Sequence, residues 1–332
     1  MLAMENSQFL SNCTADTIAD AAAALKAGHL VAFPTETVYG IGADARNPAA
    51  VQRIYAVKGR PADHPLIIHI SSINQVEKWA AEVPDYAIAL ARKFWPGPMT
   101  LIFKRSEIAQ DFVTGGQDTV GLRIPSDPLA LALIAEFEKI SDSAIAAPSA
   151  NRFGHVSPTT AQAVSDELGD YLADGDLILD GGACTVGVES TIIDCTGQSP
   201  RILRPGAITE EMISDATGLE LQTDGDDTAP VTIRVSGSLE SHYSPLATVV
   251  LDQTPRAGQG FIALSENHTP EGVIRLASPK NDEEFARVLY SSLRAADEQG
   301  LTHVVVTQPQ GGGIAIAIRD RLKRAAHPHP PQ

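Results

Sequence analysis

Short apolar runs that alternate irregularly with longer helical patterns are the feature that most constrains how this chain folds. Runs this short, bounded by Gly, Pro or polar residues, are typical of strands buried in a sheet. In the first part of the chain they predict strands at 30–33, 66–70, 99–103, 120–124, 144–147, 177–180, 190–194 and 201–203. Helices expected at 16–26, 47–58, 84–95 and 129–139 interrupt them without strict alternation. We therefore expect an α/β fold with a mixed, twisted sheet rather than a barrel.

A second, smaller domain is expected because 332 residues are more than one hydrophobic core usually holds. The polar, turn-rich stretch 224–230 indicates the boundary, inside a linker that we place at 208–245. Beyond the linker, the pattern predicts strands at 248–251, 261–264, 273–276 and 303–307 and helices at 282–299 and 315–326. The expected organisation is thus a catalytic domain at 14–207 and a Rossmann-like α/β domain at 246–326.

The charge balance and the cysteines exclude several classes of protein. A formal net charge of −16 makes the chain a poor general binder of nucleic-acid phosphates, although a local pocket can still bind an anion. Cys13, Cys184 and Cys195 give neither a disulfide framework nor the ligand spacing of a zinc site. No signal peptide and no run of about 20 apolar residues is visible. We expect a cytoplasmic protein with no membrane segment and no resident metal.

The polar residues that could carry chemistry follow the predicted strands. The common nucleotide and hydrolase motifs, such as GxxxxGK[ST] and GxSxG, are absent. Four loops instead hold hydroxyls and cations, namely 34–40, 58–65, 147–151 and 187–191, and Arg123 and Arg204 stand at strand ends beside Pro. Loops on a rigid sheet are where sites usually lie, and Lys and Arg together suit a polyphosphate. These residues predict an anion or nucleotide pocket without specifying the reaction.

Each of these residues also has an ordinary structural explanation. Arg123 or Arg204 alone could pair with a structural carboxylate, and Lys58 could complement the dipole at the end of a helix. His69 could be a core histidine, and Ser149 with Asn151 could form a turn. If Lys58 and Arg60 are exposed loop cations, they should contribute little to folding stability.

Several motifs, in order, resemble those of the YrdC-like family. KGRP followed by HPLIIHI, and then APSAN, look like the family's Lys-x-Arg and Ser-x-Asn pair. PTETVYGIGADA, WPGPMTLIF, GLRIP, GVESTIID and ILRPG fit the same family in order and spacing. The resemblance covers residues 14–207, and the later segment 241–245 with the small α/β module resembles the longer, two-domain members.

The resemblance implies an activity and a set of site residues. Family members combine L-threonine, bicarbonate and ATP into threonylcarbamoyl-adenylate and pyrophosphate, and a partner transferase then modifies an adenosine next to the tRNA anticodon. By similarity, the residues of the ATP side are Lys58, Arg60, His64, Thr119, Ser149, Asn151, Ser157, Arg204 and Tyr243, with Mg²⁺ on the ATP phosphates. The residues around threonine are Thr37, His69, Arg123, Ala147 (through its backbone) and Ser190. His64 stands where the family often has Asn, and an imidazole replaces only one of the two amide hydrogen bonds.

Cations rather than a nucleophile are expected to perform this chemistry. Carbamate formation needs its reactants held together and dry, and the attack on the α-phosphate needs positive charge, which Lys58, Arg60 and Arg204 can supply. Tyr243 in the linker suggests a lid over the pocket mouth.

Two alternatives remain open, an RNA-binding module of this fold and a carbamoyl-transfer enzyme that uses the same fold. The second class normally carries zinc-finger and acylphosphatase modules that this sequence lacks. The expected reaction does not require tRNA.

Overall fold

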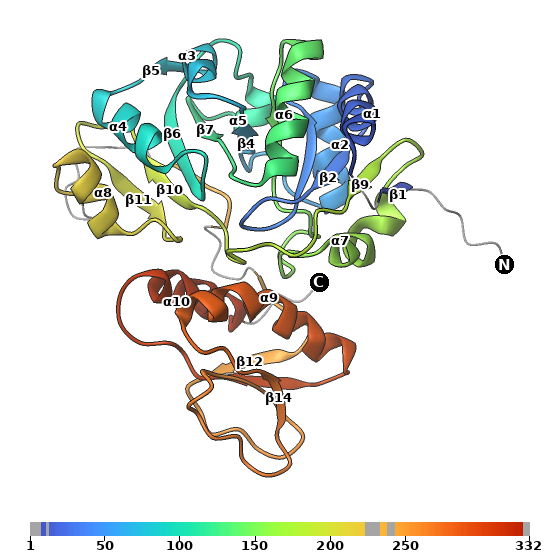
Figure 1. Ribbon diagram of the computed structural model, residues 1–332, viewed down its shortest axis with the longest axis vertical. Helices are drawn as coiled ribbons and strands as arrows, with labels where there is room; N and C mark the ends of the chain where they lie inside the picture. Colours follow the sequence, from blue (N-terminus) through green and yellow to red (C-terminus); the bar gives the residue numbers. More distant parts are fainter. Residues whose placement is uncertain (1–7, 11–12, 223–232, 238–242, 328–332) are drawn as a thin grey trace.

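The computed structural model describes residues 8–10, 13–222, 233–237 and 243–327 (Figure 1). The predicted turn-rich stretch 224–230 lies outside these residues. The larger domain contains the strands β1 (Gln8–Leu10), β2 (Val31–Phe33), β3 (Gly40–Asp44), β4 (Ile67–His69), β5 (Ala80–Glu82), β6 (Met99–Arg105), β7 (Thr119–Arg123), β8 (Ile145–Ala146), β9 (Leu177–Leu179), β10 (Thr191–Asp194) and β11 (Arg201–Arg204). Its helices are α1 (Ala15–Lys26), α2 (Pro48–Lys58), α3 (Val76–Trp79), α4 (Asp85–Phe94), α5 (Asp111–Thr114), α6 (Pro128–Ser141), α7 (Ala161–Leu168) and α8 (Glu210–Thr217), with short 3₁₀ turns at Ile73–Gln75 and Gly169–Tyr171.

These strands form one sheet of mixed direction, as the sequence predicted. Its order is β1-β9-β2-β3-β8-β4-β7-β6-β10-β11, with β5 paired to β6 at the side. β4 runs parallel to β7 and β6 parallel to β10, whereas β7 and β6 are antiparallel. Strands far apart in the sequence are therefore neighbours at the centre of the sheet, where the loops singled out above meet.

Alternation along the strands gives the sheet two apolar faces. Val31 and Phe33 of β2 pack with the helices α1 and α6 on one face. Ala32, between them, belongs to a larger core with α2, α4 and α7 on the other face. The sheet is therefore buried between two layers of helices, which leaves its strand ends as the accessible part.

Helix α2 shows how local sequence sets the position of a site residue. Asn47 caps its N-terminus by accepting hydrogen bonds from the Ala49 and Ala50 amides, and Pro48 occupies the first turn. Gly59 ends the helix in the left-handed conformation, with φ of 61°. The stop places Lys58 on the last turn and directs the following chain, with Arg60, back towards the sheet.

The smaller domain has a four-stranded parallel sheet covered by two helices. Its strands are β12 (Thr248–Leu251), β13 (Gly260–Ile262), β14 (Ile274–Ala277) and β15 (His303–Val306), in the order β12-β15-β13-β14. The helices α9 (Asp282–Glu298) and α10 (Ile314–Ala325) lie between this sheet and the larger domain (Figure 1). None of the helices in the described part of the chain is long and apolar enough to cross a bilayer.

The start of the predicted linker differs from the structure. Residues Glu210–Thr217 form α8, which packs against α4 of the larger domain, so the chain does not leave that domain at 208. Thr209 caps this helix, but Ile213 is its one fully buried side chain, and a single apolar position gives no periodicity to detect. β3 was missed because its sequence, Gly40–Asp44, reads as a glycine-rich loop.

Candidate functional site

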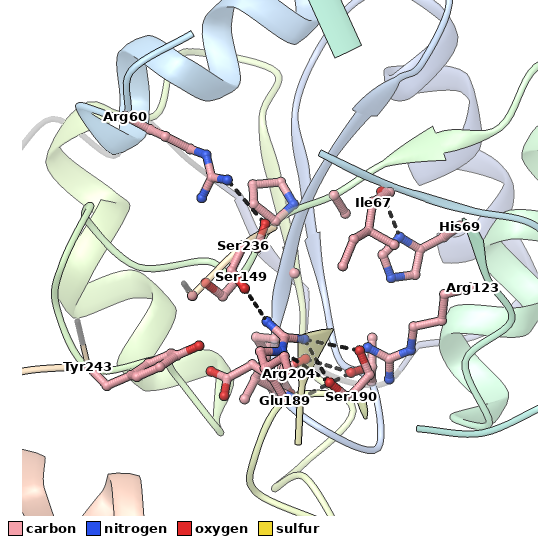
Figure 2. A pocket seen from close by; sticks show the side chains of 17 residues that line it. Arg60, Ile67, His69, Arg123, Ser149, Glu189, Ser190, Arg204, Ser236 and Tyr243 are labelled. Carbon is pink, nitrogen blue, oxygen red and sulfur yellow. Dashed lines mark hydrogen bonds between the residues drawn. The ribbon is translucent and has the colours of Figure 1, made fainter. Parts of the chain in front are cut away.

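A cavity of about 540 Å³, measured to its open mouth, lies at the strand ends of the larger domain (Figure 2). Eight of the residues proposed from the sequence line it: Arg60, His69, Arg123, Ala147, Ser149, Ser190, Arg204 and Tyr243. The other lining residues are Thr35, Val38, Tyr39, Gly40, Ile67, Pro148, Glu189, Ser236 and Gly237. One cavity therefore gathers loops that lie between residues 35 and 243 of the sequence.

Strand register brings the polar side chains together. His69 at the end of β4 pairs with Arg123 at the end of the parallel strand β7, and Arg123 pairs with Thr100 of β6. The Thr100 hydroxyl lies 2.8 Å from the hydroxyl of Ser190, which immediately precedes β10. Across the sheet, an isolated bridge between Gly40 and Ser149 joins the loop 34–40 to the loop 147–151.

Arg123 is a buried cation that is held from one side. Its Nη2 donates to Glu36 Oε1 at 2.7 Å and to Thr37 Oγ1 at 2.9 Å. Its Nε is buried and has no hydrogen-bond partner among the residues that the structure describes. The guanidinium therefore keeps donor capacity beyond the two bonds that hold it.

His69 is a neutral imidazole rather than a charged one. Burial and the nearby Arg123 lower its pKa from 6.5 to about 3. Its Nδ1 lies 3.2 Å from the carbonyl oxygen of Ile67, and its ring meets Phe33 edge-on. Since the Ile67 carbonyl and the Phe33 ring hold the imidazole, His69 can offer a hydrogen bond to a ligand without adding charge.

Arg204 and Arg60 form a second cationic region on the cavity wall (Figure 2). Arg204 donates from Nε and Nη2 to the carbonyl oxygen of Ser190, at 3.1 and 2.9 Å, and from Nη1 to that of Ser236. Arg60 donates to the Pro65 carbonyl and to the Ser236 hydroxyl. Burial lowers the pKa of Arg60 to about 10, so it remains a cation at neutral pH. Its Nε, like that of Arg123, has no partner in the described part of the chain.

Lys58 and Asn151 are fully buried beside the cavity and are not among its lining residues. The Lys58 ammonium donates to the carbonyl oxygens of Ser149 and Asn151, so it fixes the loop 147–151. Burial, and secondarily Arg60, hold the pKa of Lys58 well below its usual value. The expectation of exposed loop cations is wrong, because Lys58 is 1% and Arg60 7% exposed. Asn151 donates to the carbonyls of Arg152 and His155, while its buried Oδ1 accepts from no described residue.

The remaining proposed residues also lie close to the cavity without lining it. The hydroxyl of Ser157 donates to Glu189 at 2.7 Å, and Thr37 contacts Arg123 as described above. Thr119 lines a smaller neighbouring pocket that shares Ile67 and Ser236 with the main one. His64 packs edge-on against Phe153, and burial with Arg60 lowers its pKa.

Several lining or supporting residues were not assigned from the sequence, and four of them make contacts that matter to the site: Glu36, Glu189, Ser236 and Gly237. Glu36 and Glu189 stand inside the motifs quoted above, but an acidic residue does not look like part of an anion pocket. Here each neutralises an arginine, Glu36 with Arg123 and Glu189 with Arg321. Ser236 and Gly237 belong to the linker, where a Ser-Gly pair reads as a turn. The signal that could have found the two glutamates is a buried arginine that needs a partner.

Tyr243 brings the end of the linker into the cavity wall. Its ring is 1% exposed and stacks on Tyr290 of α9, with centroids 5.7 Å apart. The neighbouring Ser244 amide donates to the Gly154 carbonyl at 3.0 Å. Ser241 and His242, the first two residues of the segment 241–245, lie outside the described residues.

The chemical character of the cavity follows from these contacts. Three guanidinium groups, a neutral imidazole and several hydroxyls surround it, and two carboxylates balance part of the charge. Within the described ranges, no group of three or more His, Cys, Asp and Glu side chains is arranged to hold a metal ion. Such a cavity can bind an anionic ligand and stabilise negative charge that develops on it.

Comparisons with known proteins agree with this architecture. The Sua5/YciO/YrdC family model, described as "Telomere recombination", matches residues 23–206, and a model of the threonylcarbamoyl-AMP synthase C-terminal domain matches residues 208–327. A threonylcarbamoyl-AMP synthase of Pyrococcus abyssi is 40% identical over 92% of this chain and 93% of its own length. That of Bacillus subtilis is 38% identical, over 93% and 92%.

A solved structure extends the similarity to three dimensions. The crystal structure of P. abyssi Sua5 complexed with L-threonine superposes with a TM-score of 0.83 at 37% identity, and the match covers 97% of each chain. The YciO protein of Escherichia coli shares the fold of the larger domain, with a TM-score of 0.50 and 21% identity. Both domains and their order are thus accounted for, and the chain belongs to the YrdC-like family, in its two-domain branch of threonylcarbamoyl-AMP synthases.

Proposed function

We propose that this protein is a threonylcarbamoyl-AMP synthase, which converts L-threonine, bicarbonate and ATP into L-threonylcarbamoyladenylate, pyrophosphate and water. The observation that carries the proposal is the single cavity in which Arg60, Arg123 and Arg204 converge around a neutral His69. The high coverage of relatives with that name supports it further.

On the threonine side, Arg123 would bind the α-carboxylate, because its free Nε and planar fork match a carboxylate. His69, Ser190, Thr37 and the Ala147 backbone would surround the side chain and the amino group. The threonine nitrogen attacks the bicarbonate carbon, and loss of water gives the carbamate. This step needs the two reactants held close and water excluded more than it needs an acid or a base.

On the nucleotide side, a carbamate oxygen then attacks the α-phosphorus of ATP, and pyrophosphate leaves. Arg60 and Arg204 would stabilise the charge that develops on the phosphates. Lys58, Ser149, Asn151, Ser157 and Thr119 would complete the ATP side, together with His64 and Tyr243. Mg²⁺ would arrive on the phosphates of ATP as part of the substrate. Ser236, Gly237 and Tyr243 would close the mouth of the cavity as a lid.

The product would pass to a partner transferase that modifies an adenosine next to the tRNA anticodon, in the cytoplasm. tRNA is not required for the synthase step. An acidic chain in which Arg60, Arg123 and Arg204 are buried around one cavity gives an RNA-binding role little support.

Pyrophosphate release, measured with and without L-threonine and bicarbonate, tests the proposal. We expect pyrophosphate and an adenylate product only when both are present with ATP. Formation of ADP and phosphate, or turnover that does not depend on threonine, would refute the proposed function. A salt-dependent shift of tRNA without ATP turnover would favour the RNA-binding alternative, and consumption of carbamoyl phosphate would favour the carbamoyl-transfer alternative.

A further inference from the structure

The C-terminal domain contacts the cavity through one buried arginine. Arg321 of α10 is 0% exposed, although it comes from the domain that holds none of the proposed substrate contacts. Its Nε donates to Glu189 Oε2 at 2.8 Å, and its Nη2 donates to the Pro205 carbonyl at 3.0 Å. The guanidinium also lies 5.4 Å from the ring centre of Tyr243.

Each of these three partners contacts, adjoins or is itself a residue proposed for the nucleotide side, although Glu189 also adjoins Ser190 of the threonine side. Glu189 accepts the hydroxyl of Ser157, and its other oxygen also accepts the hydroxyl of Tyr290 at 2.9 Å. Pro205 directly follows Arg204. Tyr243 stacks between Tyr290 and Arg321 on the cavity wall. One guanidinium of the C-terminal domain therefore links three segments of the larger domain and the linker.

The contact between the domains is close and specific rather than a loose apolar packing. Gly187, with φ of +84°, lies so close to α9 that an added Cβ would be 2.4 Å from the Arg287 Cα. Arg294 of α9 pairs with Glu167 at 3.1 Å and donates to the Val156 carbonyl. Both loops that flank Ser157 and Glu189 are thus held against α9.

The charge state of the Glu189–Arg321 ion pair is fixed as well. Burial alone would raise the pKa of Glu189, but Arg321 and Arg204 and the hydrogen bonds from Arg321 and Ser157 hold it at about 2. Glu189 is therefore an anion at neutral pH, and its carboxylate is fully used by three donors. A carboxylate in that state orients its partners rather than exchanging protons.

We propose that Arg321 is a positioning residue for nucleotide binding, which acts through Glu189, the Pro205 carbonyl and the Tyr243 ring to set Ser157, Arg204 and Tyr243. The C-terminal domain then contributes to catalysis without touching substrate. This inference rests on the proposed function for the identity of the nucleotide. On the threonine side, Arg123 is held by Glu36 and Thr37 rather than by Glu189.

The test compares Arg321→Met with Arg319→Met in the full-length protein. Arg319 lies on the same helix but donates within its own domain, to the Pro309 and Gly311 carbonyls, so its variant controls for loss of an arginine–carbonyl bond on this helix. ATP affinity is measured by calorimetry at a temperature where both variants are folded, and KM values for ATP and threonine are measured in the pyrophosphate assay. For Arg321→Met we expect ATP binding weakened about 10-fold and the threonine KM changed less than 2-fold.

The double variant Glu189→Gln/Arg321→Met separates positioning from stability. It removes the unpaired buried charge, so its thermal midpoint should recover in part, whereas ATP binding should remain weak. Recovery of ATP binding in the double variant would overturn the proposal, because Arg321 would then only neutralise Glu189. If Arg321→Met fails to fold, Tyr290→Phe deletes one donor to the same carboxylate and should weaken ATP binding about 3-fold.

The same experiment distinguishes failure of this inference from failure of the proposed function. Unchanged ATP affinity in Arg321→Met, while the wild type makes the adenylate, would overturn the inference alone. Equal losses for ATP and threonine would also overturn it, since the effect would not be specific to the nucleotide side. A wild type that makes no adenylate but binds ATP would refute the proposed function, and the calorimetric comparison would still decide the role of Arg321.

Discussion

Glu36 binds Arg123 through a buried ion pair in which Oε1 lies 2.7 Å from Nη2 and both side chains are 6% exposed. The second carboxylate oxygen of Glu36 accepts the Ser126 amide at 3.0 Å. The glutamate is thus fixed at both oxygens, and it fixes the arginine in turn. A guanidinium oriented in this way can present its remaining N–H groups to a carboxylate without first losing conformational freedom.

Arg123→Lys should therefore impair threonine binding more than ATP binding. Lysine keeps the charge but loses the planar fork, so we expect the threonine KM to rise roughly 10-fold to 100-fold and the ATP KM to stay within about 2-fold. Steady-state kinetics of pyrophosphate release measure both. Arg201→Lys is the matched control, because Arg201 pairs with Asp194 and does not line the cavity. Equal effects of the two substitutions would show that Arg123 has no role in binding threonine.

The free energy of unfolding should decrease as the pH falls below the pKa of an unfolded histidine, because buried His69 resists protonation in the folded protein. Its pKa is about 3 when folded and near 6.5 when unfolded, so the unfolded state binds the extra proton between these values. Stability is therefore full above pH 6.5 and declines towards pH 3, by on the order of 3 kcal/mol at pH 4. Urea denaturation of the wild type and of His69→Gln at pH 4 to 8 measures this difference. Parallel stability curves for the two proteins would contradict it.

The sequence predicted the strands and long helices well because their signals are local. Most of the buried strands are short apolar runs, with β3 an exception, and α2 carries its own cap and stop signals in Asn47, Pro48 and Gly59. Long-range pairing lies beyond such signals: no pattern around His69 indicates that it pairs with Arg123, 54 positions later. Glu189 was passed over for the same reason, since its partner Arg321 belongs to the other domain.

Because Lys58 is buried, we expect its removal to affect the stability of the fold as well as the activity. Lys58→Ala should lower turnover by about 100-fold, and it should also destabilise the fold by about 2 kcal/mol, because it leaves a cavity and two buried carbonyls without their donor. The control is Lys104→Ala, which removes an exposed lysine paired with Glu82. Activity assays and urea midpoints measure both effects. If the two variants unfold at the same urea concentration, Lys58 does not hold the loop 147–151.

We expect the cavity to recognise the threonine hydroxyl through hydrogen bonds with polar groups rather than through the shape of the side chain. A site that hydrogen-bonds the hydroxyl rejects valine strongly, since its buried polar atoms would remain unpaired. Serine keeps the hydroxyl and loses a methyl group, so it should react roughly 10-fold to 200-fold less efficiently than threonine. Ratios of kcat/KM for the three amino acids measure the selection. Valine as good as serine would mean that the cavity recognises volume alone.

Through Tyr243, ligand binding should slow amide hydrogen exchange at the C-terminal end of the linker. Its ring is part of the cavity wall and stacks on Tyr290, so an occupied cavity gives it a second surface to pack against. We expect amide hydrogen exchange in peptides covering 233–237 and 243–247 to slow when ATP and threonine bind. Tyr243→Ala should abolish that protection and weaken ATP binding, whereas Tyr243→Phe keeps the ring and should retain the protection. Tyr171→Ala is a suitable control because Tyr171 is 51% exposed and is not among the residues that line the cavity. If exchange is equally slow with and without ligands, Tyr243 packs the two domains together permanently and does not act as a lid.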